Sequence, residues 1–315
     1  MALRAADAAG IAAAFCLGTD TRLTGPITRG QLGQVWRLDT HEGVYAVKEW
    51  FAEPDLGSLS ASSALHERCW AAELPVPEVV RTPGGDHTAV VAGTRVRVLG
   101  WLELMERTRR LPPAEVGRLL AELHLVSRRT TEPVIPWHSK GIGLDVWRAL
   151  HAEVSAAQAP FGERFGALVD ALASAESVIE PPGQLLVCHR DLWSDNVLPA
   201  RDGRIHVIDF ESAGPADPSH ELAMVLFEFG LNEPDRVRLL HQTYREAGGP
   251  GRISRRGDFS MLVATLSHLA EFACRRWLDA ADAAASSGAE ALVDELLDDP
   301  VTLDRIDRIL AAVQP

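Results

Sequence analysis

The sequence predicts an α+β fold in two lobes, a small β-rich N-terminal lobe and a large C-terminal lobe built mainly of helices. Between about residues 20 and 101, short alternating apolar runs are separated by Gly, Pro and Asp, which is typical of strands and turns. From Pro112 onward long helical patterns dominate, and only the segment 187–209 interrupts them. With 315 residues and 46% apolar content, the chain can form about two domains with separate cores.

We place the N-terminal lobe at residues 1–101, a connector at 102–106 and the C-terminal lobe at 107–315. The run RVRVLGWLEL indicates a last strand of the first lobe that continues into the connector. Helices of the second lobe are expected over residues 116–127, 219–230, 234–247 and 257–285.

Local patterns also predict elements of the first lobe. VYAVKEWF, at 44–51, alternates apolar residues around one lysine and indicates a strand with one polar face. LSASSALHERCWAAEL, at 59–74, indicates a helix, and PGGD at 83–86 predicts a hairpin. The alanine-rich run 1–18 is too short and too charged to span a membrane or to act as a clear secretory signal, so we expect an amphipathic helix packed on this lobe.

Four polar residues in the segment that interrupts the helical patterns have a spacing that phosphoryl transfer requires. His189, Asp191 and Asn196 form the pattern H-x-D-x-x-x-x-N, and Asp209 follows Asn196 by thirteen residues. Asp209 ends the apolar run IHVI, which indicates a buried strand that delivers a carboxylate to a cleft. Moving a phosphoryl group depends mostly on positioning, charge neutralisation and removal of the acceptor's proton.

The residue types suggest separate roles. Mg²⁺ prefers carboxylate and amide oxygens beside phosphate oxygens, so Asp209 and Asn196 are the candidate metal ligands. Asp191 then remains as the catalytic base. His189 is expected to be structural, with its ring bonded to the backbone or to a carboxylate such as Asp217, and no catalytic role is assigned to it.

The catalytic segment resembles the HRDLxxxxN loop and the DFG-type aspartate of the protein-kinase-like fold. Asp217-Pro218 follows Asp209 so closely that an activation segment does not fit, and the resemblance therefore favours the aminoglycoside phosphotransferase family over protein kinases. ADPSHELAMVLFEF resembles the G-D-P-x-x-D-L-A block of that family, with Glu221 in place of the usual aspartate. VGRLLAELHLVS, at 116–127, resembles its helix ending in L-x-x-L-H.

Two residues of the loop depart from the family pattern. Arg190 stands where aminoglycoside phosphotransferases usually have Gly. DLWS, which includes Trp193, is similar to fructosamine kinases, so the substrate subfamily stays open.

The resemblance implies a protein-kinase-like fold whose first lobe binds a nucleotide and whose second lobe carries catalysis and the acceptor. It implies ATP as donor, with GTP left open, together with Mg²⁺. Lys48 is the candidate ligand of the phosphates, to be held by a glutamate of the following helix, for which Glu67 is the best choice and Glu73 an alternative. Gly30 and Gly33 lie in a predicted turn, and Gly33 precedes Lys48 by fifteen residues. In this family a loop that covers the phosphates is expected at this position. No G-x-x-x-x-G-K-[ST] pattern occurs.

Three residues are candidates for the acceptor pocket. Glu228 or Glu271 could bind an ammonium group of the acceptor, and Trp193 could form a wall. For Glu271 we favour the simpler interpretation, a surface ion pair with Arg275 four residues later. A core role for Trp193 is an equal alternative.

Composition excludes some partners. The net charge of −13 opposes unspecific binding to nucleic acid or to anionic membranes. It favours a cationic acceptor and equally serves solubility. The cysteines, Cys16, Cys69, Cys188 and Cys274, are dispersed without a ligand pattern, so buried apolar roles in a reducing, cytoplasmic setting are expected.

These observations predict an ATP- and Mg²⁺-dependent kinase that transfers the γ-phosphoryl group to a hydroxyl of a small polar acceptor. An amine-bearing acceptor, such as an aminoglycoside, an amino sugar or a related antibiotic or metabolite, is favoured. The alternative is a catalytically silent kinase-like sensor of a nucleotide or metabolite. Neither the identity of the acceptor nor the oligomeric state follows from the sequence.

Overall fold

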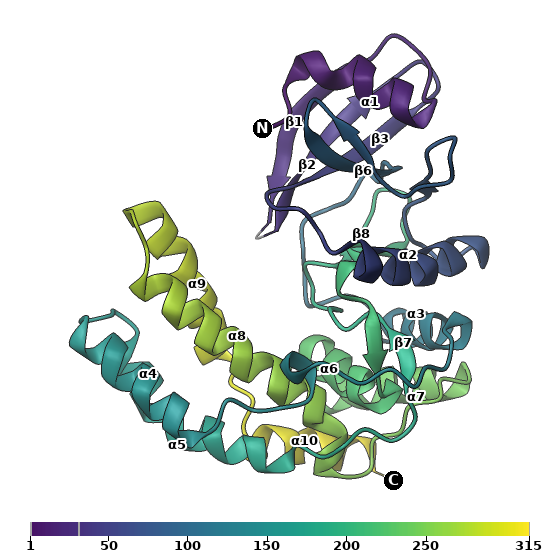
Figure 1. Ribbon diagram of the computed structural model, residues 1–315. Helices are drawn as coiled ribbons and strands as arrows, with labels where there is room; N and C mark the ends of the chain where they lie inside the picture. Colours follow the sequence, from purple (N-terminus) through teal and green to yellow (C-terminus); the bar gives the residue numbers. More distant parts are fainter. Residues whose placement is uncertain (1, 31, 315) are drawn as a thin grey trace. The chain divides into compact units, whose positions relative to one another are not determined.

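The computed structural model describes residues 2–30 and 32–314, and the chain forms two compact units. The first unit comprises residues 1–108 and 189–214, and the second comprises 109–188 and 215–315. The expected α+β class is confirmed, with an antiparallel sheet in the first unit and mostly helices in the second (Figure 1). The sequence-based division groups residues 189–214 with the second lobe, whereas the compact units place this segment with the first.

The first unit is built on one antiparallel sheet. Its strands are β1 (Arg22–Arg29), β2 (Gly33–Asp39), β3 (Val44–Trp50), β4 (Val79–Val80), β5 (Ala89–Val91) and β6 (Thr94–Gly100). The strand order is β1-β2-β3-β6-β4, and β5 also pairs with β6. The predicted strand at 44–51 is confirmed as β3, which lies between β2 and β6. Lys48 is therefore central in the sheet, opposite Val35 on one side and Arg97 on the other.

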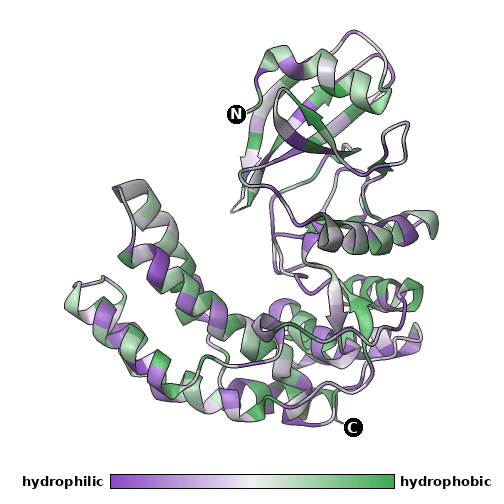
Figure 2. Cartoon of the chain, in the orientation of Figure 1, coloured by the Kyte–Doolittle hydropathy of each residue, from purple (hydrophilic) through white to green (hydrophobic). Residues whose placement is uncertain are grey.

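An N-terminal helix covers this sheet. Helix α1 (Ala8–Phe15) follows the short turn η1 (Ala5–Asp7) and buries Ile11 and Phe15 in one cluster with Leu38 and Val47. Hydrophobic residues of α1 and of the strands share this core, as the colouring of Figure 2 shows. The expectation of an amphipathic N-terminal helix packed on the lobe is confirmed, although Met1 lies outside the described residues.

The predicted hairpin at Pro83–Asp86 is corrected by the structure. The segment does turn, and Thr82 N donates to Asp86 O, but it connects β4 to β5, and each of these strands pairs with β6. The tight hairpin connects β5 to β6 through Ala92 and Gly93. Both residues have positive φ, 50° and 79°, the conformation that a two-residue hairpin loop requires.

A helix and a second hairpin complete the first unit. Helix α2 (Leu56–Ala71) confirms the predicted helix, and β8 (Val197–Pro199) pairs with β9 (Ile205–Val207), which leads to the turn η4 (Phe210–Ser212). Backbone hydrogen bonds attach this hairpin to the N-terminal part of the chain: Met105 N donates to Pro199 O, and Val207 N donates to Pro75 O. These bonds explain why residues 189–214 fold with the first unit.

Helix α2 is joined to β6 and η4 through one buried histidine. His66 is 1% exposed, its Nε2 lies 2.8 Å from Pro77 O, and its Nδ1 accepts from Arg97 at 3.3 Å. Its ring stacks on Phe210, with ring centres 4.3 Å apart and planes at 9°. Burial, and then the charge of Arg97, lower the pKa of His66 to about 3, so the ring is neutral.

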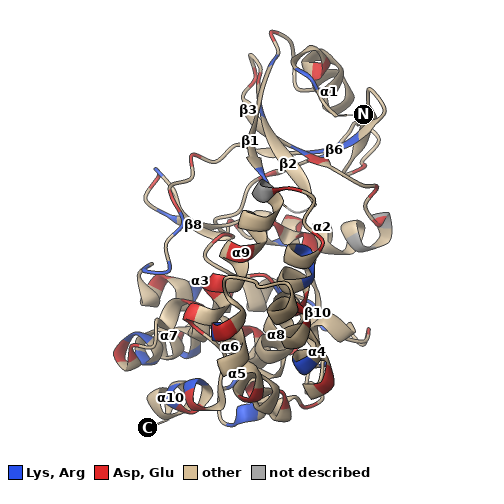
Figure 3. Ribbon diagram, turned by 90° about the vertical axis from the view of Figure 1, so that its left-hand side faces the viewer, with Lys and Arg blue, Asp and Glu red and all other residues tan. Residues whose placement is uncertain are grey.

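The second unit consists mainly of helices. They are α3 (Pro113–Val126), α4 (Leu144–Ala156), α5 (Gly162–Ala175), α6 (Pro218–Gly230), α7 (Pro234–Glu246), α8 (Ser260–Leu278), α9 (Ala283–Asp298) and α10 (Leu303–Val313). Shorter elements are η2 (Pro136–His138), η3 (Glu176–Val178), η5 (Arg256–Phe259), β7 (Leu186–Cys188) and β10 (Gly214–Ala216). Both acidic and basic residues occur along helices such as α7 and α10 (Figure 3).

The predicted long helix at 257–285 is wrong. It is divided into η5, α8 and α9, and α8 ends at Leu278. The Asp282 side chain accepts from Ala285 N and caps α9, which gives that helix a start of its own. The other three helices predicted for this lobe correspond to α3, α6 and α7.

A buried polar chain ties α3, α6 and α7 together. His124 Nε2 lies 2.8 Å from Glu221 Oε2, and His124 Nδ1 lies 2.8 Å from the hydroxyl of Tyr244. The same hydroxyl accepts from Gly251 N at 2.7 Å. His124 belongs to the segment that resembles the L-x-x-L-H helix, and Glu221 belongs to the segment that resembles the D-P block. The two segments thus meet inside one core, and these buried polar groups are partners of one another.

Three of the four cysteines are buried, as expected, whereas Cys16 is exposed. Cys16 ends α1 with a left-handed conformation, φ 54°, at the edge of the helix rather than in its packed face. All four thiols are free. Among the described residues, no helix is both long and apolar enough to cross a membrane.

Because His66 is neutral when buried, the stability of the protein should fall as the pH is lowered. The histidine takes up a proton near pH 6.5 in the unfolded chain but only near pH 3 in the folded protein. The free energy of unfolding therefore keeps its full value above pH 6.5 and decreases as the pH falls below it. Between pH 6.5 and 5 this effect is about 1 to 2 kcal/mol. Urea unfolding at several pH values, compared between wild type and His66→Gln, measures it. The control is His41→Gln, the same substitution at a half-exposed histidine of this unit. Equal slopes for wild type and His66→Gln would contradict the prediction.

Candidate active site

The loop between β7 and β8 brings the predicted base and a predicted metal ligand into contact. Asn196 Nδ2 donates to Asp191 Oδ2 at 2.8 Å and to Asp191 O at 2.9 Å. The turn is closed by a backbone bond from Asn196 N to Trp193 O at 2.9 Å. No described residue donates to Asn196 Oδ1, so the amide fixes Asp191 with its nitrogen and keeps its oxygen for another partner.

The environment of Asp191 suits a base that works near neutral pH. Burial, followed by the negative charge of Asp209, raises the pKa of Asp191 to about 7. The hydrogen bond from Asn196 and the charge of Lys48 act in the opposite direction and are weaker. A carboxyl group with a pKa near the working pH can accept a proton and release it again.

The second predicted metal ligand, Asp209, lies against Lys48. Lys48 Nζ is 3.1 Å from Asp209 Oδ1 and 3.2 Å from Oδ2. Asp209 directly follows β9 and adopts the left-handed conformation, φ 58° and ψ 64°, which aspartate tolerates better than most residues. Burial alone would raise the pKa of Asp209, but the charge and hydrogen bond of Lys48, together with the charge of His189 and the backbone of Glu211, lower that pKa. Asp209 is therefore an anion with its side chain still 40% exposed.

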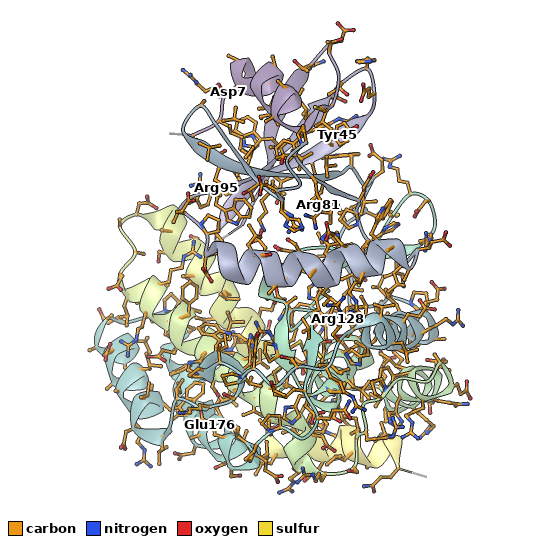
Figure 4. All side chains as sticks on the ribbon, turned by 45° about the vertical axis from the view of Figure 1, so that its right-hand side comes forward. Asp7, Tyr45, Arg81, Arg95, Arg128 and Glu176 are labelled. Carbon is orange, nitrogen blue, oxygen red and sulfur yellow. The ribbon has the colours of Figure 1, made fainter. Side chains whose placement is uncertain are left out.

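The predicted ion pair between Lys48 and Glu67 is wrong. Lys48 pairs instead with Glu211, whose Oε1 lies 2.8 Å from Nζ. The carboxylate of Glu67 accepts two hydrogen bonds from Arg81, at 2.5 and 2.6 Å, and also contacts His87 at 3.2 Å. Figure 4 places Arg81 between the sheet and helix α2.

The phase of helix α2 explains this difference. Neighbouring residues of a helix point about 100° apart, and on α2 the side chain in contact with β6 is that of His66. Glu67 is therefore turned toward the segment 81–87.

Two neighbours of Asp191 have structural roles. His189 Nε2 lies 3.0 Å from the backbone oxygen of Ile208, and the imidazole meets Phe210 edge to face at 4.7 Å. This agrees with the expected structural role and with the backbone alternative for its partner. Arg190 has φ 65° and donates from Nε to Ser212 O at 2.6 Å, so it ties the catalytic loop to the turn after Asp209.

The turn between β1 and β2 contains the predicted glycines. Gly30 N donates to Gly33 O at 2.9 Å, and Gln31 between them lies outside the described residues. A Cβ at Gly33 would lie 2.3 Å from Glu49 O, so the close approach of β2 to β3 requires glycine there. Strand packing thus explains why residue 33 is a glycine. Contact with phosphates stays a prediction for both Gly30 and Gly33.

Of the three candidate acceptor residues, one belongs to the first unit and two belong to the second. In the first unit Trp193 is half-buried. In the second unit Glu228 is buried and its Oε2 lies 3.1 Å from Arg109 Nε, while Glu271 accepts from Arg275 at 3.0 Å. The ion pair favoured for Glu271 from the sequence is therefore present.

Sequence reasoning missed Glu211 and its neighbours. Glu211 stands two residues after Asp209, and this second carboxylate beside the predicted metal ligand was the available signal. The indole of Trp50 donates to Glu211 Oε2 at 3.2 Å. Nothing in the pattern around Trp50 indicates this contact, because it depends on the register between β3 and the turn after β9.

Comparison with known proteins agrees with this geometry. A family model described as the phosphotransferase enzyme family matches residues 24–257, well over half of the chain. A homoserine kinase from Methylocella silvestris is 28% identical over 227 residues, which cover 70% of this chain and 68% of that protein.

Solved structures share the fold at low sequence identity. An aminoglycoside phosphotransferase from Alicyclobacillus acidocaldarius is 17% identical, with a TM-score of 0.61 over 92% of this chain and 91% of that one. A spectinomycin phosphotransferase, solved with ADP and spectinomycin, is 14% identical, with a TM-score of 0.63 over 93% and 92%. A microcompartment-associated aminopropanol kinase is 15% identical, with a TM-score of 0.55 over 92% and 95%. The protein-kinase-like fold expected from the catalytic motif is thereby confirmed. Because the family model spans the sheet, the catalytic loop and helices α3 to α7, the chain belongs to the phosphotransferase enzyme family and is a small-molecule kinase with a hydroxyl acceptor.

Proposed function

We propose that the protein transfers the γ-phosphoryl group of ATP, with Mg²⁺, to a hydroxyl of a small polar acceptor that carries an amine. One observation carries the proposal. Two polar pairs, Asp191 with Asn196 and Asp209 with Lys48, lie in one compact unit, and the charges of Asp209 and Lys48 both act on Asp191. This is the combination of base, metal ligands and phosphate ligand that the reaction needs.

Asp191 is proposed to orient the acceptor hydroxyl and to take its proton. Its amide partner, Asn196, holds the carboxylate through Oδ2. We propose that Oδ1 of Asp191 is the oxygen that contacts the acceptor hydroxyl. The raised pKa supports this role, because a more basic carboxylate accepts a proton more readily from a hydroxyl that is losing it.

The oxygen donors present fit a Mg²⁺ ion. Asp209 supplies a carboxylate with an exposed side chain, and Asn196 supplies an amide oxygen that no described residue occupies. When bound, the ion would neutralise phosphate charge. Lys48 adds a fixed positive charge for the phosphates, and the turn with Gly30 and Gly33 is proposed to cover them. Nothing distinguishes ATP from GTP, so ATP is proposed on the basis of the family resemblance.

Several relatives are named for acceptors that combine an amine with a hydroxyl, such as homoserine and aminopropanol. The net charge of −13 also favours a cationic acceptor. We propose Trp193 as a wall of the acceptor pocket. Glu228 and Glu271 remain candidates for an ammonium group, although each would have to exchange its arginine partner.

A panel of acceptors tests the proposed function. The purified protein is incubated with Mg²⁺-ATP and homoserine, aminopropanol, ethanolamine, choline or aminoglycosides, and ADP release is measured. We expect release above the background rate with amine-bearing alcohols and not with matched alcohols that lack the amine. ADP release with none of the panel, while Mg²⁺-ATP still binds, would favour the nucleotide sensor instead. Phosphorylation of generic protein substrates would contradict the proposal.

Replacing the base should affect turnover and not nucleotide binding. Asp191→Asn keeps the shape and the contact with Asn196 but cannot accept the proton, so kcat should fall by roughly 10² to 10⁴. The control is Asp195→Asn, on the same loop, because Asp195 is 64% exposed and pairs with Arg107. We expect it to retain nearly all activity. Full turnover in Asp191→Asn would remove the assignment.

Replacing the second aspartate should affect the metal. In calorimetric titrations, wild type should bind ADP more tightly with Mg²⁺ than with EDTA, because the ion links the phosphates to Asp209. Asp209→Asn has a weaker oxygen donor and should lose most of this difference. Asp202→Asn, a change of an exposed aspartate in the β8–β9 turn, is the control. An unchanged gain from Mg²⁺ in Asp209→Asn would disprove its metal role.

A further inference from the structure

We infer that Glu211 is the residue that positions Lys48, in place of a glutamate on helix α2. The inference rests on the proposed function, in which Lys48 contacts the nucleotide phosphates. Glu211 Oε1 lies 2.8 Å from Lys48 Nζ, and the two side chains are 14% and 16% exposed. Because little water screens them, this pair is stronger than an ion pair at the open surface.

The carboxylate of Glu211 is itself held in place. Its second oxygen, Oε2, accepts from the indole nitrogen of Trp50 at 3.2 Å. Lys48 and Trp50 are two residues apart on β3, so their side chains leave the strand on the same face. One carboxylate therefore contacts two neighbouring side chains of β3, and this fixes the strand to the turn that follows Asp209.

A buried arginine adds a second positive charge to the surroundings of Glu211. Arg97 stands opposite Lys48 in the register of β3 and β6, and it is only 2% exposed. It donates to the neutral ring of His66, and no described residue accepts from its Nε. Glu211 and Asp209 are the carboxylates whose charges act on it most strongly. Arg97 thus adds a desolvated positive charge to the group formed by Lys48, Asp209 and Glu211.

The glutamate of helix α2 therefore does not pair with Lys48. This glutamate, Glu67, is occupied by Arg81 and His87. Lys48 is instead bound to Asp209 and Glu211, two residues of one turn. In this arrangement β3 and the turn after β9 set the distance between the proposed phosphate ligand, Lys48, and the proposed metal ligand, Asp209.

Nucleotide affinity tests the inference. Binding of ATP and ADP is measured by calorimetry in EDTA, so that a metal ion plays no part. Glu211→Gln removes the charge and should weaken binding about tenfold, which corresponds to about 1.4 kcal/mol. Glu67→Gln, the same substitution on α2, should leave the affinity within about twofold. Glu211→Asp keeps the charge on a shorter stem and should lie between wild type and Glu211→Gln.

A double-mutant cycle shows whether Glu211 acts through Lys48. In a Lys48→Gln background, Glu211→Gln should change the affinity by less than about twofold. An undiminished effect in that background would overturn the inference, because Glu211 would then act independently of Lys48. Equal effects of Glu211→Gln and Glu67→Gln would also overturn it. If wild type binds no nucleotide at all, the proposed function itself fails, and the two failures are distinguishable.

Thermal unfolding and circular dichroism establish that the variants fold. Trp50→Phe keeps the aromatic packing and removes the N–H that orients Glu211, so it provides a second probe with intact charges. It should weaken metal-free nucleotide binding in the same direction and by less than Glu211→Gln. Unchanged binding in Trp50→Phe together with unchanged binding in Glu211→Gln would overturn the inference even if Lys48→Gln did not fold.

Discussion

The ion pairs of Lys48 are the interaction on which the rest of the site depends. One ammonium group lies 3.1 Å from Asp209 and 2.8 Å from Glu211, and it joins these two neighbouring carboxylates. Removing it would leave two close carboxylates without the cation that they share. Lys48 can hold this position because β3 is paired on both sides, with β2 and with β6. A central strand gives its side chains less freedom than an edge strand or a loop.

The two aspartates differ because their surroundings differ. Asp209 faces a cation and has its pKa lowered, whereas Asp191 is buried beside that anion and has its pKa raised to about 7. One carboxylate is thereby suited to a metal ion and the other to a proton. Phe210 stacks on His66 and meets His189 edge to face, and these contacts join helix α2 to the turn and to the catalytic loop.

The sequence predicted the residues whose spacing is fixed by chemistry and missed those whose position depends on packing. Asp191, Asn196 and Asp209 follow from one short pattern, and Lys48 follows from a single lysine in an apolar strand. Glu67 was misassigned because a shift of one residue on a helix turns a side chain by about 100°, and periodicity does not define the phase that precisely. The hairpin at 83–86 and the helix at 257–285 failed for a related reason. The short strands β4 and β5 both pair with β6, and α9 has a start of its own at the Asp282 cap. Local sequence patterns do not determine either of these contacts.

The grouping of residues 189–214 with the first unit also lies beyond local patterns. It results from backbone bonds to Pro75 and Met105, more than 90 residues away in the sequence.

The central claim, that Asp209, Asn196 and Lys48 act together on a metal-bound nucleotide, is tested most directly by a crystal structure with Mg²⁺ and ADP. The account predicts a metal ion coordinated by Asp209 and by Asn196 Oδ1, with Lys48 Nζ bonded to a phosphate oxygen. Phosphates bound elsewhere, or a metal ion held by neither residue, would contradict it.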